Sequence, residues 1–387
     1  MKTNLSFLLA LACVGVNPVL GQGMLMVDNP ALPSGEANAI TFSGGIFAAN
    51  DMVPVSHFGD APWPADYRTR EGTNLAVGNM RAAFGTRRGD WSVGYFYRQD
   101  WLLKASRDTV DAHYLDQTNQ LTSGARAFDL DYSLQGFSAD GLRLAFSRAN
   151  ATADGGEWRW GVAASLMHGY DVRLEQAQGN LLTTVGSATL VGNRELFNTR
   201  LRAVPAAASF NAFSPGPAQD VPAGWGYSLD LGLSRNFRNG ANLALAVNDV
   251  LGQIKWDRVP LITQNINGTF AGNTFNSGAS AIVSGVNRYQ SLTLDLKPKL
   301  RIEADYPLGE TTLLARVEGV DGQWFPQVGI SHAIASKWRV GLDYETRFGA
   351  AEISLRHANY YLALSSQSLK LNESQALGIA AGLSYAF

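Results

Sequence analysis

The chain has 387 residues, and its 31 basic residues almost balance its 33 acidic ones, which leaves a formal net charge of -2. So balanced a charge provides no basic surface for nucleic acid, and we exclude nucleic-acid partners. The 40 glycines and the 10% of aromatic residues suit a β protein rich in turns, either a soluble one or a membrane barrel with aromatic girdles.

The first residues predict a signal peptide over residues 1–21. Lys2 makes the start positive, residues 5–16 are mostly apolar, and Val19 and Gly21 occupy positions −3 and −1 of a cleavage site before Gln22. The apolar run is too short for a permanent membrane helix, which needs about 20 residues. We therefore expect export from the cytoplasm.

Cys13 is the only cysteine in the sequence. An alternative that remains open is a lipoprotein signal, with Cys13 as the lipidated residue after Ala10-Leu11-Ala12. If the signal peptide is instead removed, the mature chain has no thiol for a disulfide or for a thiolate metal site.

Residues 22–37 precede the first patterned segment and contain Asn29-Pro30-Ala31. An ordinary turn is one interpretation of this tripeptide, since Asn-Pro favours turns. From residue 38 to the end the pattern changes to an alternation of apolar and polar residues.

This alternation predicts strands of a barrel wall, in which successive side chains face lipid and lumen in turn. Residues 291–306 show it best, with leucines at 292, 294, 296 and 300 on one face and only Pro298 interrupting. The predicted strands are 38–48, 74–84, 91–101, 125–137, 141–151, 157–174, 197–210, 224–237, 241–256, 289–306, 311–334, 338–348, 351–364 and 375–387.

The connections are consistent with this count of about fourteen. Short links near 85–89, 138–141, 238–240, 307–310 and 349–350 are expected at the periplasmic end, and longer ones at 49–73, 102–124, 257–288 and 365–374 outside. Residues 311–334 are treated as one bent strand. Residues 175–196 do not fit the scheme, and a hairpin there would raise the count to sixteen.

The last strand ends in Tyr385-Ala386-Phe387, with Tyr385 and Phe387 on its apolar face. A terminal aromatic behind an alternating strand resembles the C-terminal signature that the barrel-assembly machinery reads. The sequence therefore predicts an all-β fold, a transmembrane antiparallel β-barrel over residues 38–387. We expect it in the outer membrane, with membrane lipids and the assembly machinery as partners.

The polar face of the predicted strands carries charges of both signs. A pore selective for one ion sign would carry a ring of one sign, whereas mixed signs favour an interior network of ion pairs that holds a plug. The predicted lumen-lining residues are Asp295, Lys297, Arg301, Glu303, Arg339, Asp343, Glu345 and Arg347.

Catalytic and metal-binding motifs are not found in the sequence. The five histidines, at 57, 113, 168, 332 and 357, do not share metal-ligand spacing. Asp108, Asp111 and His113 on a predicted outer loop form the one candidate for a rim enzyme. We predict no enzyme, no metal and no cofactor.

The tripeptide Asn29-Pro30-Ala31 resembles a motif near the N-terminus of the long-chain fatty-acid transporter family. This resemblance implies fourteen strands, an N-terminal hatch over residues 22–37 inside the lumen, and passage of hydrophobic molecules. The stretch 241–252, with Asn248-Asp249, is similar to conjugal-transfer proteins of the TraF type. Both readings stay open: a channel for hydrophobic or small molecules, or a barrel without transport that serves conjugation, assembly or surface interaction.

Overall fold

A computed structural model describes residues 23–32, 38–59, 63–203, 213–215, 223–272, 279–357 and 359–387. The predicted signal peptide, residues 1–21, lies outside the described residues. Within the described residues no helix has both the length and the apolar character needed to cross a membrane.

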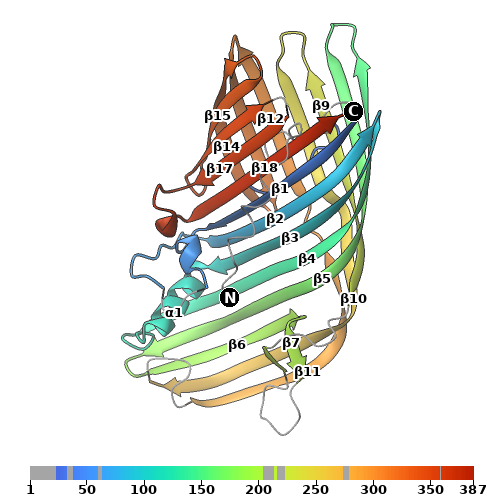
Figure 1. The fold of residues 1–387 in the computed structure, drawn as a ribbon. Helices are drawn as coiled ribbons and strands as arrows, with labels where there is room; N and C mark the ends of the chain where they lie inside the picture. The colour runs from blue at the N-terminus through green and yellow to red at the C-terminus, as the bar shows by residue number, and fades with distance from the viewer. Residues whose placement is uncertain are drawn as a thin grey trace.

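Sixteen strands of the described chain form one antiparallel sheet, and it closes on itself because β1 pairs with both β2 and β18 (Figure 1). The strands are β1 (Asn38–Asn50), β2 (Thr73–Arg88), β3 (Trp91–Ser106), β4 (Arg126–Ala151), β5 (Glu157–Thr184), β6 (Ser187–Asn198), β9 (Gly224–Asn236), β10 (Asn242–Ala271), β11 (Ala279–Asp295), β12 (Lys299–Leu308), β13 (Thr311–Val320), β14 (Gln323–Ala335), β15 (Trp338–Glu345), β16 (Ala350–His357), β17 (Tyr360–Ser366) and β18 (Ala376–Ala386). Strands β7 (Leu201–Ala203) and β8 (Phe213–Pro215) form a separate pair.

These sixteen strands occupy fourteen positions around the wall. Strands β6 and β9 both lie between β5 and β10, one above the other. Strands β11 and β12 both pair with the opposite edge of β10. The predicted closed barrel of fourteen strands is therefore confirmed.

Several predicted strand boundaries are wrong, and the errors cancel in the count. The predicted strands 125–137 and 141–151 are the single strand β4, and the segment 175–196 is the β5–β6 hairpin. The segment 311–334 is two strands, because Asp321 and Gly322 both adopt positive φ and form a tight turn. The segment 351–364 is likewise β16 and β17, and of 197–210 only residues 197–203 are described.

The two ends of the barrel differ in their connections. Both termini of the sheet lie at the end where β2–β3, β4–β5, β9–β10 and β12–β13 are joined by short turns, which we call the short-turn end. The other, the long-loop end, carries residues 51–72, 107–125 and 367–375, with the helices η2 (Val55–His57), α1 (Arg107–Gln117) and η3 (Leu371–Glu373). Three predicted links are corrected: 138–141 lies inside β4, 349–350 lies at the long-loop end, and 257–288 is mostly strand.

The outer face of the wall is apolar and exposed. Leu142, Leu166 and Trp225 expose 60–68% of their surface, which would be costly in water but is favourable in lipid. At the short-turn end the belt finishes in aromatic residues, among them Tyr385 at 57% and Phe387 at 66% exposure. The chain is a transmembrane β-barrel, as the alternation predicts.

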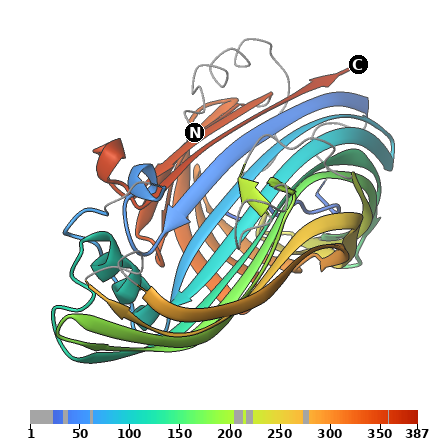
Figure 2. The same ribbon diagram turned by 90° about the horizontal axis from the view of Figure 1, so that it is seen from below.

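One side of the wall is much taller than the other (Figures 1 and 2). Strands β4, β5 and β10 have 26, 28 and 30 residues, whereas β15 and β16 have 8 each. A strand needs about 9–11 residues to cross a membrane, so the tall strands continue beyond it at the long-loop end. We call this part of β4, β5, β6, β10 and β11 the extension.

Helix α1 covers the outer face of the extension. Its Ala112 and Leu115 are buried with Phe128 of β4 and Leu181 of β5. At its start, Ser106 Oγ and Asp108 Oδ2 bind the main chain of Asp129, so the free edge of β4 is capped. The apolar face of 125–137, which alternation assigns to lipid, is therefore buried by protein here.

Candidate functional site

The candidate site is the N-terminal segment 23–32, which lies inside the barrel. Met24, Leu25, Met26 and Val27 each expose 7% or less of their surface, in one apolar cluster with wall residues such as Phe325. Burying a side chain of this size contributes about 1.5–3 kcal/mol relative to exposing it. This segment therefore fills the lumen as a packed plug, and we call it the plug segment.

The tripeptide Asn29-Pro30-Ala31 is a turn that fits into the wall. The Asn29 side-chain oxygen accepts a hydrogen bond from the Ala31 amide at 2.9 Å, and the Asn29 side-chain amide donates to the Leu245 carbonyl at 3.2 Å. Ala31 has no exposed surface. The turn that Asn-Pro favours is thus present, and it also contacts the inner face of the wall.

Two glycines make room for this turn. Gly161 of β5 and Gly232 of β9 lie directly opposite each other. A Cβ atom on Gly161 would lie 2.3 Å from the Pro30 carbonyl carbon, and one on Gly232 would lie 2.1 Å from the Asn29 side-chain oxygen. Only a residue without a side chain leaves the backbone accessible at such distances, so this glycine pair is the seat of the turn.

Asp28 connects the plug segment to the wall through charge. Its carboxylate forms ion pairs with Arg81 at 2.7 Å and Arg143 at 2.9 Å. Burial raises the pKa of Asp28, but the two arginines outweigh it and hold the pKa below its usual value. The side chain of Asn248 binds both the amide and the carbonyl of Asp28, each at 2.8 Å. Asn248 thus pairs with the plug segment as a neighbouring strand would.

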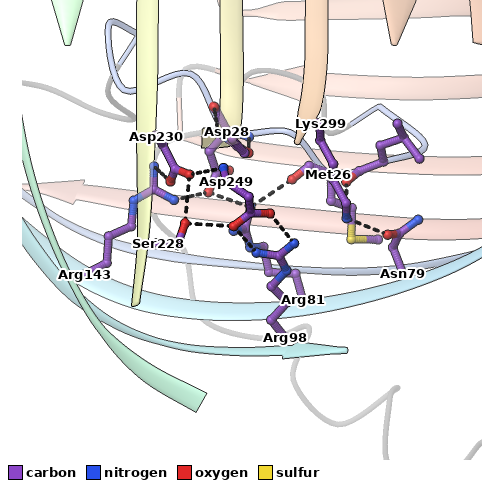
Figure 3. A network of polar contacts seen from close by, with 12 residues as sticks. Met26, Asp28, Asn79, Arg81, Arg98, Arg143, Ser228, Asp230, Asp249 and Lys299 are labelled. Carbon is purple, nitrogen blue, oxygen red and sulfur yellow. Dashed lines mark hydrogen bonds and ion pairs between the residues drawn. The ribbon is translucent and has the colours of Figure 1, made fainter. Parts of the chain in front are cut away.

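Asn248 reaches the plug segment because β10 bulges at this point. Three residues, 248–250, stand against Asp230 of β9, and Asp249 has a positive φ of 57°. The bulge also aims Asp249 at Arg98, whose guanidinium binds both carboxylate oxygens, at 2.9 and 2.5 Å (Figure 3). Asp249 is 1% exposed and Arg98 6%. Arg98 also binds Asp100 at 2.5 Å, so its guanidinium lies between two carboxylates.

The charges continue around the plug segment as a connected network (Figure 3). Arg143 also binds Asp230 at 2.9 Å, and Ser228 donates to Asp249 at 2.7 Å. On the other side Lys299 binds Asp100 at 2.9 Å and donates to the Leu25 carbonyl at 3.3 Å. Acidic and basic groups alternate, so the buried charges are paired with one another and also bind the polar groups of the plug segment.

The predicted lumen-lining residues lie in several parts of the barrel and bind different partners. Arg301 binds Glu318 at 2.7 Å, and Glu318 accepts the Leu25 amide at 2.8 Å, so this pair holds the plug segment. Glu303 binds Arg316 at 2.6 Å, and Arg339 donates to Thr312 at 2.8 Å.

At the long-loop end, Arg347 binds Asp51 at 2.7 Å, and Glu345 accepts the amides of Arg347 and Phe348. Asp343 is 4% exposed and lies over Gly329. These contacts tie the loops and the shorter side of the wall together, and they do not touch the plug segment.

The alternation changes phase at Pro298, which corrects the place of Asp295. Leu294 and Leu296 are buried in an interior cluster, whereas on the other side of Pro298 the inward residues are Lys299 and Arg301. Asp295 is exposed and opposite Gln253, on the face away from Leu294. Lys297 is 45% exposed and 3.5 Å from Asp321. A proline that breaks the ladder lets the strand resume one residue out of phase.

The network residues Arg98, Arg143 and Asp249 were not among the predicted site residues. Arg98 and Arg143 occupy positions of β3 and β4 whose side chains point inward by the alternation of these strands. The alternation alone is therefore enough to predict that both lie in the lumen. Asp249 gave no such signal, because the bulge that turns it inward is a tertiary feature.

The residues considered for a rim enzyme have structural contacts. Asp111 accepts from Tyr67 at 3.0 Å, His113 lies 2.9 Å from Gln117, and Asp108 caps β4. Burial lowers the pKa of His113. These contacts fasten α1 to its surroundings.

A cavity of about 180 Å³ lies on the short-turn side of the plug segment, lined by Asp28, Phe96, Arg143 and Glu303 among others. On the other side Phe137, Val172, Phe197, Trp256 and Leu292 form the interior apolar cluster. The alternation assigns Val172 to lipid, but β5 carries one extra residue at Tyr170, which turns Val172 inward. The plug segment thus lies between a cavity lined by both charged and apolar side chains and a cluster of apolar ones, and Phe96 belongs to both.

The fold and the site define a class: transmembrane β-barrels closed by their own N-terminal segment. No family model and no curated protein matches the chain. Among solved structures it is similar to the toluene transporter TodX of Pseudomonas putida, with 11% identity over 95% of each chain and a TM-score of 0.48. The toluene transporter TbuX of Ralstonia pickettii has 13% identity over 96% of this chain and 95% of that one, with a TM-score of 0.29.

A FadL homologue of Pseudomonas aeruginosa has 10% identity over 97% of this chain and 100% of that one, with a TM-score of 0.29. At these values the likeness concerns the barrel alone. The similarity to conjugal-transfer proteins stays a prediction.

Proposed function

We propose that this chain is an outer-membrane channel for hydrophobic or amphipathic small molecules, closed at rest by the plug segment as a hatch. The observation that carries the proposal is the order of surfaces along the lumen. An apolar cluster around Phe137 and Trp256 lies next to the plug segment, and a cavity lined by both charged and apolar side chains lies behind it. Apolar side chains facing the interior of a barrel give a hydrophobic molecule a place that water does not offer.

A small pocket beside the plug segment supports an amphipathic substrate. It has a volume of about 40 Å³, and its lining combines apolar side chains such as Leu102, Phe137 and Val320 with charged ones, namely Arg98, Asp100, Lys297 and Lys299. Lys297 is 45% exposed. A molecule with an apolar body and one acidic or hydroxyl group matches these walls. Release toward the short-turn end then requires that the plug segment move.

Uptake measurements in cells test the proposal. A deletion strain that carries the wild-type gene should take up a labelled monoaromatic hydrocarbon or a labelled aliphatic acid faster than the strain with an empty vector. Phe137→Asp, which charges the apolar cluster, should reduce that uptake at least tenfold, whereas Leu166→Asn on the lipid-facing side should leave it within twofold. Equal uptake with and without the gene would contradict a channel.

The second function, a barrel without transport that serves conjugation, assembly or surface interaction, is favoured by one observation. The plug segment has hydrogen bonds or ion pairs with β2, β4, β10, β12 and β13, so the closed state is strongly held. A wild-type barrel that conducts nothing, but whose deletion impairs transfer or surface attachment, would support this alternative.

We also infer that the last strand is the assembly signal. Tyr385 and Phe387 point outward, where the barrel-assembly machinery and membrane lipids would meet them. Phe387→Ser should lower the amount of barrel in the outer membrane, measured by heat-dependent gel mobility, while Ser384→Ala, buried in the same strand, should not.

A further inference from the structure

The extension has a polar face that the channel function does not use. On β4 the even-numbered residues face outward with Leu142 and Leu144, and the odd-numbered ones face inward with Arg143. Asp129 and Asp131 belong to the inward set. This face therefore looks over the mouth of the barrel, while the opposite face lies under α1.

Three strands contribute to this inward face. Asp129 is opposite Asn180, and Asp131 is opposite Gln178, which in turn is opposite Asn193 of β6. Residues directly opposite in a ladder share a face. The five side chains line an open groove of about 450 Å³ together with Val191, which is 50% exposed.

The side chains of this groove are available to a ligand. All five polar residues are exposed. Many other polar side chains of the barrel interior, Arg98 and Glu318 among them, are engaged in ion pairs. Along the described strands, by contrast, these five form no internal side-chain hydrogen bond or ion pair. The groove is thus a polar surface whose donors and acceptors the fold leaves open.

The chemistry of the groove selects its ligand. Carboxylates only accept hydrogen bonds, whereas the amides of Asn and Gln both donate and accept, and a hydroxyl does both as well. The described lining contains neither Lys nor Arg, so two carboxylates would repel a phosphate or sulfate. A molecule with many neutral hydroxyls fits this combination, and the exposed Val191 can contact the apolar face of a sugar ring.

The position of the groove agrees with such a ligand. Along β5, Gln178 and Asn180 lie beyond Tyr170, toward the long-loop end, and Tyr170 and Trp225 are exposed aromatic residues of the kind that mark the membrane interface. Asn265 of β10 lies opposite Asn193 and extends the amide surface across the extension. We propose that this groove, which we call the vestibule groove, binds a neutral oligosaccharide at the cell surface.

Binding of defined sugars to the whole protein in lipid nanodiscs tests the proposal. The probes are neutral oligosaccharides of glucose, galactose, mannose and N-acetylglucosamine, with a sulfated oligosaccharide as the charged comparison. We expect at least one neutral probe to bind and the sulfated one not to bind. The double variant D131A/N193A should weaken that binding at least tenfold, without changing the melting temperature of the barrel.

A matched control distinguishes binding at the vestibule groove from nonspecific binding of sugars to the protein. Glu71→Ala with Asn372→Ala removes one carboxylate and one amide at the same end of the barrel but away from the extension. This control should bind the neutral probe within twofold of wild type. The proposal is overturned if no neutral probe binds, if the sulfated probe binds more tightly, or if the control loses as much affinity as the double variant.

Discussion

The glycine pair that seats the plug segment permits a direct test of the closed state. Replacing Gly232 by alanine adds one methyl group, which would lie 2.1 Å from the Asn29 side-chain oxygen and 2.7 Å from the Ala31 amide. Neither contact can be accommodated without movement, and both partners belong to a buried turn. We expect the turn to leave its seat while the wall keeps its ladder.

The size of the effect follows from two costs. Overpacking a buried site costs about 1–3 kcal/mol, and losing the hydrogen bond from Asn29 to the Leu245 carbonyl adds about 0.5–1.5 kcal/mol. The two costs sum to about 1.5–4.5 kcal/mol, and a value of about 2 kcal/mol within that range raises the undocked population roughly 30-fold, since 1.4 kcal/mol is a factor of ten.

Thiol labelling measures that population. Val27 is 2% exposed, and Val27→Cys changes its volume little. If the segment redocks faster than the thiol reacts, the maleimide labelling rate is proportional to the undocked fraction. Labelling should therefore be about 30-fold faster when Gly232→Ala is added.

The control is Gly44→Ala in β1, where the added methyl would be 3.5 Å from its nearest neighbour. This variant should label within twofold of the parent. If Gly232→Ala labels at the parental rate and the barrel unfolds at the same denaturant concentration, the turn is not held by this seat, and the reasoning fails.

Three further predictions concern the polar network. Asp249→Ala leaves Arg98 buried with Asp100 as its partner and should lower the free energy of unfolding in lipid by about 1–3 kcal/mol, measured by urea titration. Arg98→Met combined with Asp249→Leu should recover much of it, and a single variant as stable as wild type would contradict this. Asn248→Ala removes both hydrogen bonds to the Asp28 main chain and should speed labelling at position 27 about tenfold, by roughly 1–2 kcal/mol; unchanged labelling would show that Asn248 does not anchor the segment. The pKa of Asp28 is below its usual value because its arginine partners outweigh the effect of burial. The contribution of Asp28 to closure is therefore present above about pH 3.9, the ordinary Asp value, and is lost as the pH falls through the lowered pKa. The conductance of the reconstituted protein should rise in that pH range, and Asp28→Asn should be more conductive already at neutral pH.

Several features of this protein are local, so the pattern of residues along the chain is enough to predict them. A strand shows alternate side chains to opposite faces whatever it pairs with, so period-two patterning predicted the wall and the outward Tyr385 and Phe387. The same pattern predicted that Arg301 and Glu303 belong to a lumen of mixed charge. Asp321-Gly322 also has the composition of a tight turn, but the predicted count of about fourteen strands treats it as a bend within the single strand 311–334.

The site itself arises from tertiary contacts, because it joins residues that are far apart in the chain. The seat of Asn29-Pro30-Ala31 requires that Gly161 and Gly232 become neighbours through strand pairing, which no local pattern encodes. The phase of an alternation is also lost wherever a bulge or a proline inserts a residue, as at Pro298. Beyond each such point the side chains turn to the other face, and only the paired strands of the closed wall show which face is inside.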